Sequence, residues 1–101
     1  GGDLGHLLEN VVCLELLRRG YQVMVGKMGD AEIDFIALQS GQPTYFQVAL
    51  SVRDESTLKR ELTPLLQVSD HYPKYLLTLD PDPLILHDGI RQVYALDWLL
   101  E

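Results

Sequence analysis

The sequence predicts one α/β domain of the α+β type, in which a mixed central sheet is flanked by helices. Its 101 residues suit a single domain, and the 47% that are apolar are enough to build a core. Three short runs of strand composition lie between two helical runs, and further apolar runs follow. Three strands with short links form an antiparallel meander, and a strand after the second helix can lie parallel to it.

The chain opens with a helix and a strand. Residues 4–19 follow the helical apolar period and end at Gly20, with two arginines in the last turn. Apolar side chains cover well over half of this helix, so we expect it to be buried on more than one side. Residues 21–26 are rich in strand-forming types, and residues 27–31 form a polar turn.

The next two strands each carry a polar side chain among apolar ones. A hairpin connection, residues 39–43, joins the strand at 32–38 to the strand at 44–51. Strict alternation divides the first of these strands into two faces, Glu32, Asp34 and Ile36 against Ile33, Phe35 and Ala37. In the second, it places on one face Tyr45, Gln47 and Ala49.

The second half of the chain begins with a helix over residues 54–68, in which Pro64 predicts a kink or a break. Asp97 is expected to cap a final helix that starts at Trp98. Between these helices we expect a loop at 69–73, a buried strand at 74–80, an irregular segment at 81–89 and a last strand at 90–97.

Charge and composition limit the classes of partner. A nucleic-acid-binding domain usually carries a basic surface, so the net charge of −7 disfavours tight DNA binding by this domain alone. The lone Cys13 fits a reducing cytoplasm. No apolar run approaches the ~20 residues of a bilayer span, and no signal peptide pattern is present, so no membrane contact is expected. We give Gly1 and Gly2 no weight, because they can be remnants of cloning.

Three polar residues from separate predicted elements form a constellation: Glu9 on the first helix, Asp34 in the second strand and Gln47 in the third. It resembles the PD-(D/E)XK nuclease superfamily, whose restriction-endonuclease-like core runs αβββαβ. The resemblance implies that Glu9, Asp34, Gln47 and the backbone carbonyl of Val48 bind Mg²⁺ or Mn²⁺ and activate water. Ala49 stands where that superfamily keeps its lysine.

A longer pattern resembles one group more closely. The segments GHLLENVVCLELLRRGYQVMVGK, EIDF, FQV, KRELTPL and HYPKYLL are similar to a domain of unknown function behind an AAA-like P-loop ATPase domain in bacteria and archaea. The resemblance implies that residues 3–101 are the nuclease-like C-terminal fragment of a larger ATPase, with its own N-terminal ATPase domain as partner. The sequence contains no Walker motif, so no ATP site is expected in this fragment.

Two classes of function follow from the departures at Gln47 and Ala49. In the first, the chain is a Mg²⁺- or Mn²⁺-dependent DNA phosphodiesterase with a degenerate site, in which Lys27 acts as a migrated lysine and Glu32 supplies the missing carboxylate. In the second, it is a catalytically inactive docking or dimerisation module of the ATPase. A third reading treats Asp34 and Gln47 as hydrogen-bonded polar residues of the sheet and nothing more.

Overall fold

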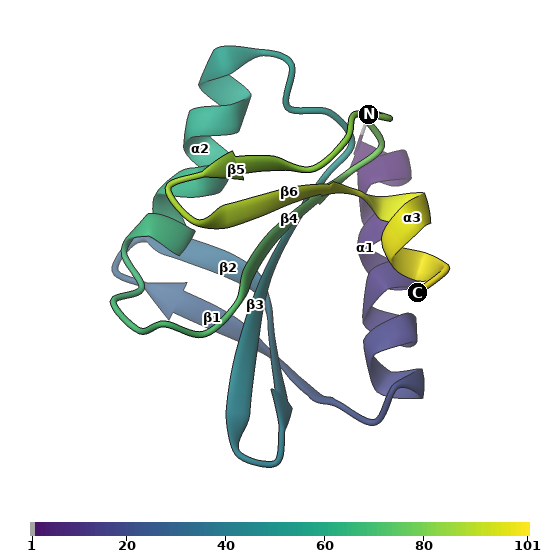
Figure 1. The fold of residues 1–101 in the computed structure, drawn as a ribbon, viewed down its shortest axis with the longest axis vertical. Coiled ribbons are helices and arrows are strands. Elements are labelled where there is room, and N and C mark those ends of the chain that lie inside the picture. Colours follow the sequence, from purple (N-terminus) through teal and green to yellow (C-terminus); the bar gives the residue numbers. More distant parts are fainter. Residues whose placement is uncertain (1) are drawn as a thin grey trace.

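The computed structural model describes residues 2–101 as a mixed six-stranded sheet flanked by helices (Figure 1), which confirms the predicted fold class. Along the chain the elements are α1 (Gly2–Arg18), β1 (Gln22–Met28), β2 (Ala31–Gln39), β3 (Gln42–Ala49), α2 (Glu55–Leu66), β4 (Lys74–Thr78), β5 (Ile85–His87), β6 (Ile90–Tyr94) and α3 (Ala95–Leu99). The strand order in space is β1-β2-β3-β4-β6-β5. As expected, β1, β2 and β3 form an antiparallel meander, and β4 runs parallel to β3.

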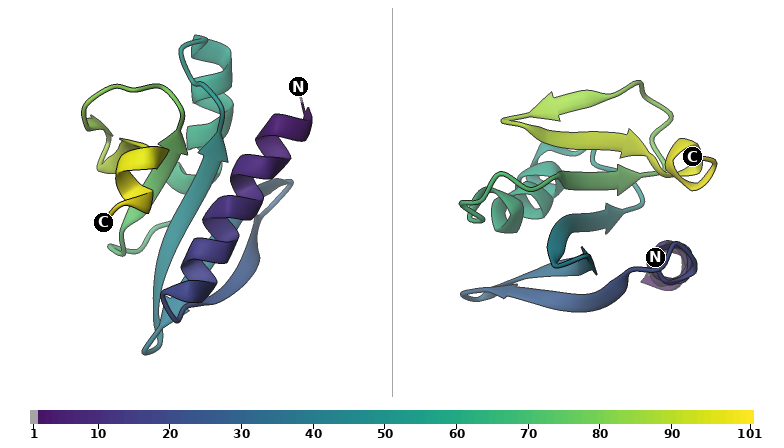
Figure 2. Two further views of the ribbon diagram at one scale, coloured as in Figure 1. Left: turned by 90° about the vertical axis from the view of Figure 1, so that its right-hand side faces the viewer. Right: turned by 60° about the horizontal axis from the view of Figure 1, so that its bottom comes forward.

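The helices form two layers. One face of the sheet is covered by α1 and α3 and the other by α2 (Figures 1 and 2). The first layer buries Leu8, Val12, Leu16, Ala37, Phe46, Val48, Leu77, Ala95 and Trp98. The second buries Ile33, Tyr45, Val52, Leu65, Leu76 and Ile90. Within residues 2–101 no helix is both long enough and apolar enough to cross a membrane.

The hairpin turns explain a strand that the sequence prediction missed. Ser40 and Gly41 have φ angles of 54° and 76° and join β2 to β3 in a two-residue turn. Asp88 and Gly89 repeat this geometry, with φ angles of 50° and 88°, between β5 and β6. The prediction that residues 81–89 are irregular is therefore wrong for β5. The Asp-Gly pair was the signal that marked this hairpin.

Several predicted boundaries also move. Because β1 extends to Met28, Lys27 lies in a strand and not in a turn. β6 ends at Tyr94 and α3 begins one residue later, so Asp97 lies in the first turn of α3 and does not cap it. Asp54 caps α2 by accepting hydrogen bonds from the N–H groups of Ser56 and Thr57.

α2 continues for two residues past Pro64 and ends at Leu66, which is earlier than the predicted end at residue 68. Proline has no N–H, so Pro64 leaves the Arg60 carbonyl without its helical donor, a small loss in the last turn of a helix. The helix continues through Pro64, so the prediction of a break at this residue is wrong.

The first helix is buried on one side only. Leu8, Val12 and Leu16 pack on the sheet, but Leu7 and Leu14 are exposed. The expectation that α1 is buried on more than one side is therefore wrong for the part of the chain that the structure describes.

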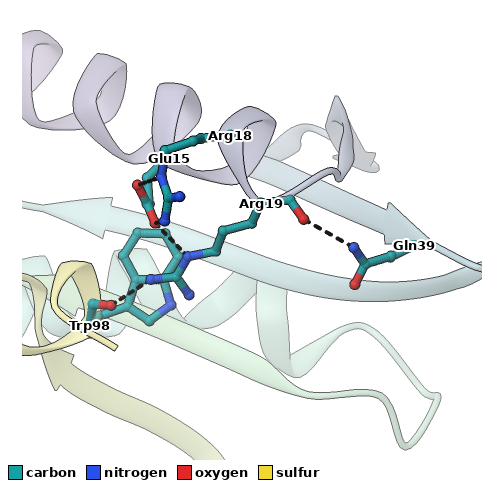
Figure 3. Close-up of polar contacts among 5 residues, drawn as sticks. All are labelled: Glu15, Arg18, Arg19, Gln39 and Trp98. Carbon is teal, nitrogen blue, oxygen red and sulfur yellow. Dashed lines mark hydrogen bonds and ion pairs between the residues drawn. The ribbon is translucent and has the colours of Figure 1, made fainter.

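Arg19 connects the end of α1 to α3 (Figure 3). Its guanidinium lies 4.4 Å from the centre of the Trp98 ring and donates to the Trp98 carbonyl at 2.8 Å. Glu15 accepts from both Arg18 and Arg19, and these two arginines, Arg18 first, lower the pKa of Glu15 to about 2. This network fixes α3 beside the longer helix.

Candidate functional site

Asp34 and Gln47 lie where β2 and β3 separate. The two strands stop pairing after Phe35 and Phe46. Beyond that point, Gln47 Oε1 accepts a hydrogen bond from the Asp34 N–H at 2.7 Å, and Asp34 Oδ2 accepts one from the Val48 N–H at 2.9 Å. The two side chains that stand out in the sequence are therefore direct neighbours, and they take the place of backbone bonds between diverging strands.

An extra residue in β2 interrupts its alternation just before this opening. Between the pairs Met24–Ile36 and Gly26–Ile33, β2 advances three residues while β1 advances two, which defines a β-bulge. Ile33 and Ile36 both pack on the α2 side, whereas Phe35 packs on the α1 side. The strict alternation predicted for this strand is therefore wrong.

The bulge sets the direction of Asp34, whose carboxylate reaches across to the backbone of β3. Gly26 permits the close approach of the two strands at this point. A Cβ added to Gly26 would lie 2.7 Å from Ile36 Cδ1 and 3.2 Å from Ile33 Cβ, so any larger residue must push one of these side chains aside.

Gln47 joins three elements and is only 3% exposed. Besides accepting from β2, its Nε2 donates to the Glu61 carbonyl of α2 at 3.1 Å and to the Glu32 carbonyl of β2 at 3.4 Å. A glutamate at this position could accept the first bond but could not donate the other two. These partners give a structural reason for glutamine at this position.

The charges of three carboxylates from three elements affect one another. Burial raises the pKa of Asp34 to about 6 against the lowering effect of the Val48 N–H, and repulsion from Glu9 and Glu32 adds to the rise. Burial also raises the pKa of Glu61 to about 7, helped by repulsion from Asp34 and then Glu9. Glu9 of α1 therefore raises the pKa of both Asp34 and Glu61, and Asp34 raises that of Glu61.

Glu61 is the member of this group that sequence reasoning missed. It lies three residues after Leu58 and four before Leu65, so it falls inside the apolar stripe of α2. An acidic residue in a buried helical stripe is rare unless it is paired or functional. That position in the helical period was the available signal.

The other candidates lie at the edge of the group or apart from it. Glu9 is half-buried, and one of its oxygens lies 3.3 Å from His6 Nδ1. Lys27 is opposite Glu32 on neighbouring strands, and their charged atoms are 3.3 Å apart in an exposed pair. Ala49 packs on the α2 side of the sheet. Within residues 2–101, no ion pair includes Asp34 or Glu61.

The oxygen atoms at this site are of the type that hard cations bind, but they are not arranged as a complete coordination shell. Among the described residues, no three His, Cys, Asp or Glu side chains are placed to hold a metal ion together. Mg²⁺ keeps several waters and needs only one or two carboxylates, which Asp34 and a glutamate can supply. In an extended strand the N–H and C=O of one residue point to the same side, so the Val48 carbonyl is directed toward β2, as its N–H is.

Comparison with known proteins gives one clear relative. The chain is 42% identical over all 101 residues to an uncharacterized protein of Haemophilus influenzae, and it spans 24% of that protein's length. No family model matches the chain. No solved structure matches it either.

Proposed function

We propose that this chain is the nuclease-like domain of a larger P-loop ATPase, with a divalent-cation site at Asp34 that acts weakly on DNA phosphodiesters. The observation that carries the proposal is the half-buried Asp34 carboxylate at the opening between β2 and β3, where one of its oxygens accepts the Val48 N–H at 2.9 Å. The order of helices and strands, with β4 parallel to β3, is also that of an αβββαβ core.

Each residue has a distinct part in this proposal. Asp34 would hold Mg²⁺ or Mn²⁺ together with the Val48 carbonyl, and Glu9 and Glu61 would add negative charge nearby. When bound, the cation would supply charge neutralisation at a phosphodiester and a more acidic water. Gln47 holds Asp34 in position through its backbone, because its Oε1 already accepts the Asp34 N–H.

Among residues 2–101, no basic side chain forms an ion pair with Asp34 or Glu61. Ala49 stands in place of a lysine, and the exposed Lys27 is engaged by Glu32. A lysine would help to position water and stabilise developing charge, so its absence favours slow hydrolysis. Lys27 is the basic residue that we assign to this role.

Cleavage of DNA in Mn²⁺ tests this function. Plasmid, single-stranded and branched DNA are incubated with the wild-type chain and with Asp34→Asn, which keeps an oxygen for the Val48 N–H. The matched control is Asp88→Asn, which removes one charge at the β5–β6 turn. We expect slow cleavage by the wild type and the control and none by Asp34→Asn. Cleavage that survives Asp34→Asn, or no cleavage by any of the three proteins, contradicts an active site here.

A second function, a catalytically inactive docking or dimerisation module of the ATPase, is favoured by a different observation. Gln47 is fully occupied in joining β2, β3 and α2, which is a structural task. Retention of the parent's ATPase activity and assembly by Asp34→Asn, with loss of both on deletion of the domain, would support this alternative. We place the protein in the cytoplasm, where the lone Cys13 stays reduced.

A further inference from the structure

α1 carries a second apolar stripe on the side that faces away from the sheet. Leu4, Leu7, Val11 and Leu14 are 55%, 56%, 37% and 65% exposed. Their spacing of three, four and three residues places them on one line along the helix. Figure 2 shows α1 in front of the sheet, with its outer side away from the other elements. A continuous apolar line of this kind on a surface helix indicates a contact with another helix.

This stripe is separate from the carboxylates at the sheet opening. At 100° per residue, Glu9 points in nearly the opposite direction from the midpoint between Leu7 and Val11. Leu8, Val12 and Leu16 occupy the sheet-facing side. The stripe therefore contributes nothing to the domain's own core or to the site at Asp34.

We infer that the stripe pairs with the stripe of a second copy of this chain, with the two α1 helices antiparallel. The 3-4-3 spacing reads the same in both directions, so a two-fold axis places Leu4 against the partner's Leu14 and Leu7 against the partner's Val11. Every position of the stripe then meets an aliphatic side chain, which makes the surface self-complementary.

The charges at the ends of the helix select the antiparallel arrangement. Asp3 lies in the first turn of α1 and Arg18 in the last, beside the end of the stripe. In this register the partner's Asp3 faces the end of α1 that holds Glu15, Arg18 and Arg19, whose charges sum to +1, at both ends of the contact. Parallel pairing would instead place the two Asp3 side chains together and the two Arg18 side chains together, and like charges repel.

The interface between the two α1 helices is short, so we expect weak association. The 17 residues of α1 span about 25 Å at 1.5 Å per residue, so the stripe makes a small interface. Interfaces at the lower end of the usual size range belong to weak and transient complexes. We therefore expect a dimer with a dissociation constant in the micromolar range, roughly 10–100 μM.

Sedimentation equilibrium of the full 101-residue chain over a wide concentration range tests the pairing. We expect a monomer–dimer equilibrium in the wild type and a monomer in the double variant Leu7→Glu/Leu14→Glu. The control Leu66→Glu alters a side chain of α2 that is 51% exposed and should leave the dimer unchanged. Circular dichroism checks that all three proteins are folded. A wild-type chain that stays monomeric at about 1 mM overturns the inference and assigns the stripe to another partner.

Cross-linking tests the orientation. In a Cys13→Ser background, the Leu4→Cys chain, the Leu14→Cys chain and an equal mixture of the two are oxidised in three separate reactions. We expect a disulfide dimer only in the mixture. Disulfide dimers within each separate variant would indicate parallel helices and contradict the arrangement. The inference is independent of the proposed cation site, because Leu7→Glu/Leu14→Glu should bind Mn²⁺ as the wild type does, while Asp34→Asn should still dimerise.

Discussion

At the scale of single residues, the site is organised by a reciprocal exchange of side-chain bonds. Asp34 and Gln47 each bind a backbone N–H of the other's strand, and Gln47 also donates to two carbonyls. The same four contacts explain why both residues are polar in otherwise apolar strands. They also leave one oxygen of Asp34 without a protein hydrogen bond among the described residues, so that oxygen remains available to a ligand.

Substitution of Gln47 tests this organisation. Gln47→Leu removes the acceptor for the Asp34 N–H and the donors to Glu61 and Glu32, which leaves buried polar groups without partners. We expect the free energy of unfolding to fall by about 2–4 kcal/mol in urea denaturation. Gln47→Glu keeps the acceptor but loses the donors, and it adds a negative charge beside the neighbouring carboxylates. The free energy of unfolding of this variant should therefore fall more at pH 8 than at pH 5. No change in either variant would contradict this role.

The sequence led to Asp34 and Gln47 but not to their surroundings. Polarity within an apolar strand is visible in a sequence, because the two-residue period of a strand is regular. The bulge in β2 is not, since it depends on how β1 and β2 pair around Gly26. Glu61 was missed because its helix was assigned from its leucines, although its position among them was informative.

At the scale of elements, the sheet was easier to predict than its edges. The meander and the second helix follow from long apolar periods and from short polar links. β5 is only three residues long and follows a proline-rich segment, so no period could reveal it. The outer side of α1 was expected to be buried because its residues are apolar, but it is exposed in the structure. The apolar pattern of a helix does not show which element covers each side.

The attachment of α3 to α1 gives a prediction at this scale. Arg19→Ala removes both the contact with the Trp98 ring and the bond to the Trp98 carbonyl. We expect a loss of about 1–3 kcal/mol in the free energy of unfolding and faster amide exchange in α3. The control Arg18→Ala changes a side chain that is 69% exposed and should have little effect. Equal effects of the two variants would show that Arg19 does not hold α3.

At the scale of the whole molecule, the half-buried carboxylates of Asp34 and Glu61 make the free energy of unfolding depend on pH. Asp34 and Glu61 have folded-state pKa values of about 6 and about 7, well above those of an unfolded chain. Between about pH 4 and 7 the folded state therefore binds more protons, so stability falls as the pH rises through this window. Glu15 has the opposite effect at lower pH, because its pKa is lowered to about 2 in the folded state. Its contribution to stability is lost as the pH falls from about 4 toward 2.

Thermal unfolding across pH 4–8 checks this dependence. We expect the wild type to lose on the order of 2–4 kcal/mol between pH 5 and pH 8. Asp34→Asn removes one of the interacting charges, so it should be more stable than the wild type at pH 8 and show a smaller pH dependence. Asp88→Asn serves as the charge control and should follow the wild-type curve. A wild-type stability that rises steadily from pH 5 to pH 8 would contradict the raised pKa values.

The central claim is that the opening between β2 and β3 is a cation site built around Asp34. The most direct measurement is anomalous diffraction from crystals soaked in Mn²⁺ at pH 8, where the carboxylates are ionised. We predict an anomalous peak within coordination distance of Asp34 and near Glu9 or Glu61 in the wild type, and no peak there in Asp34→Asn. Wild-type crystals without a peak at Asp34 would contradict the claim.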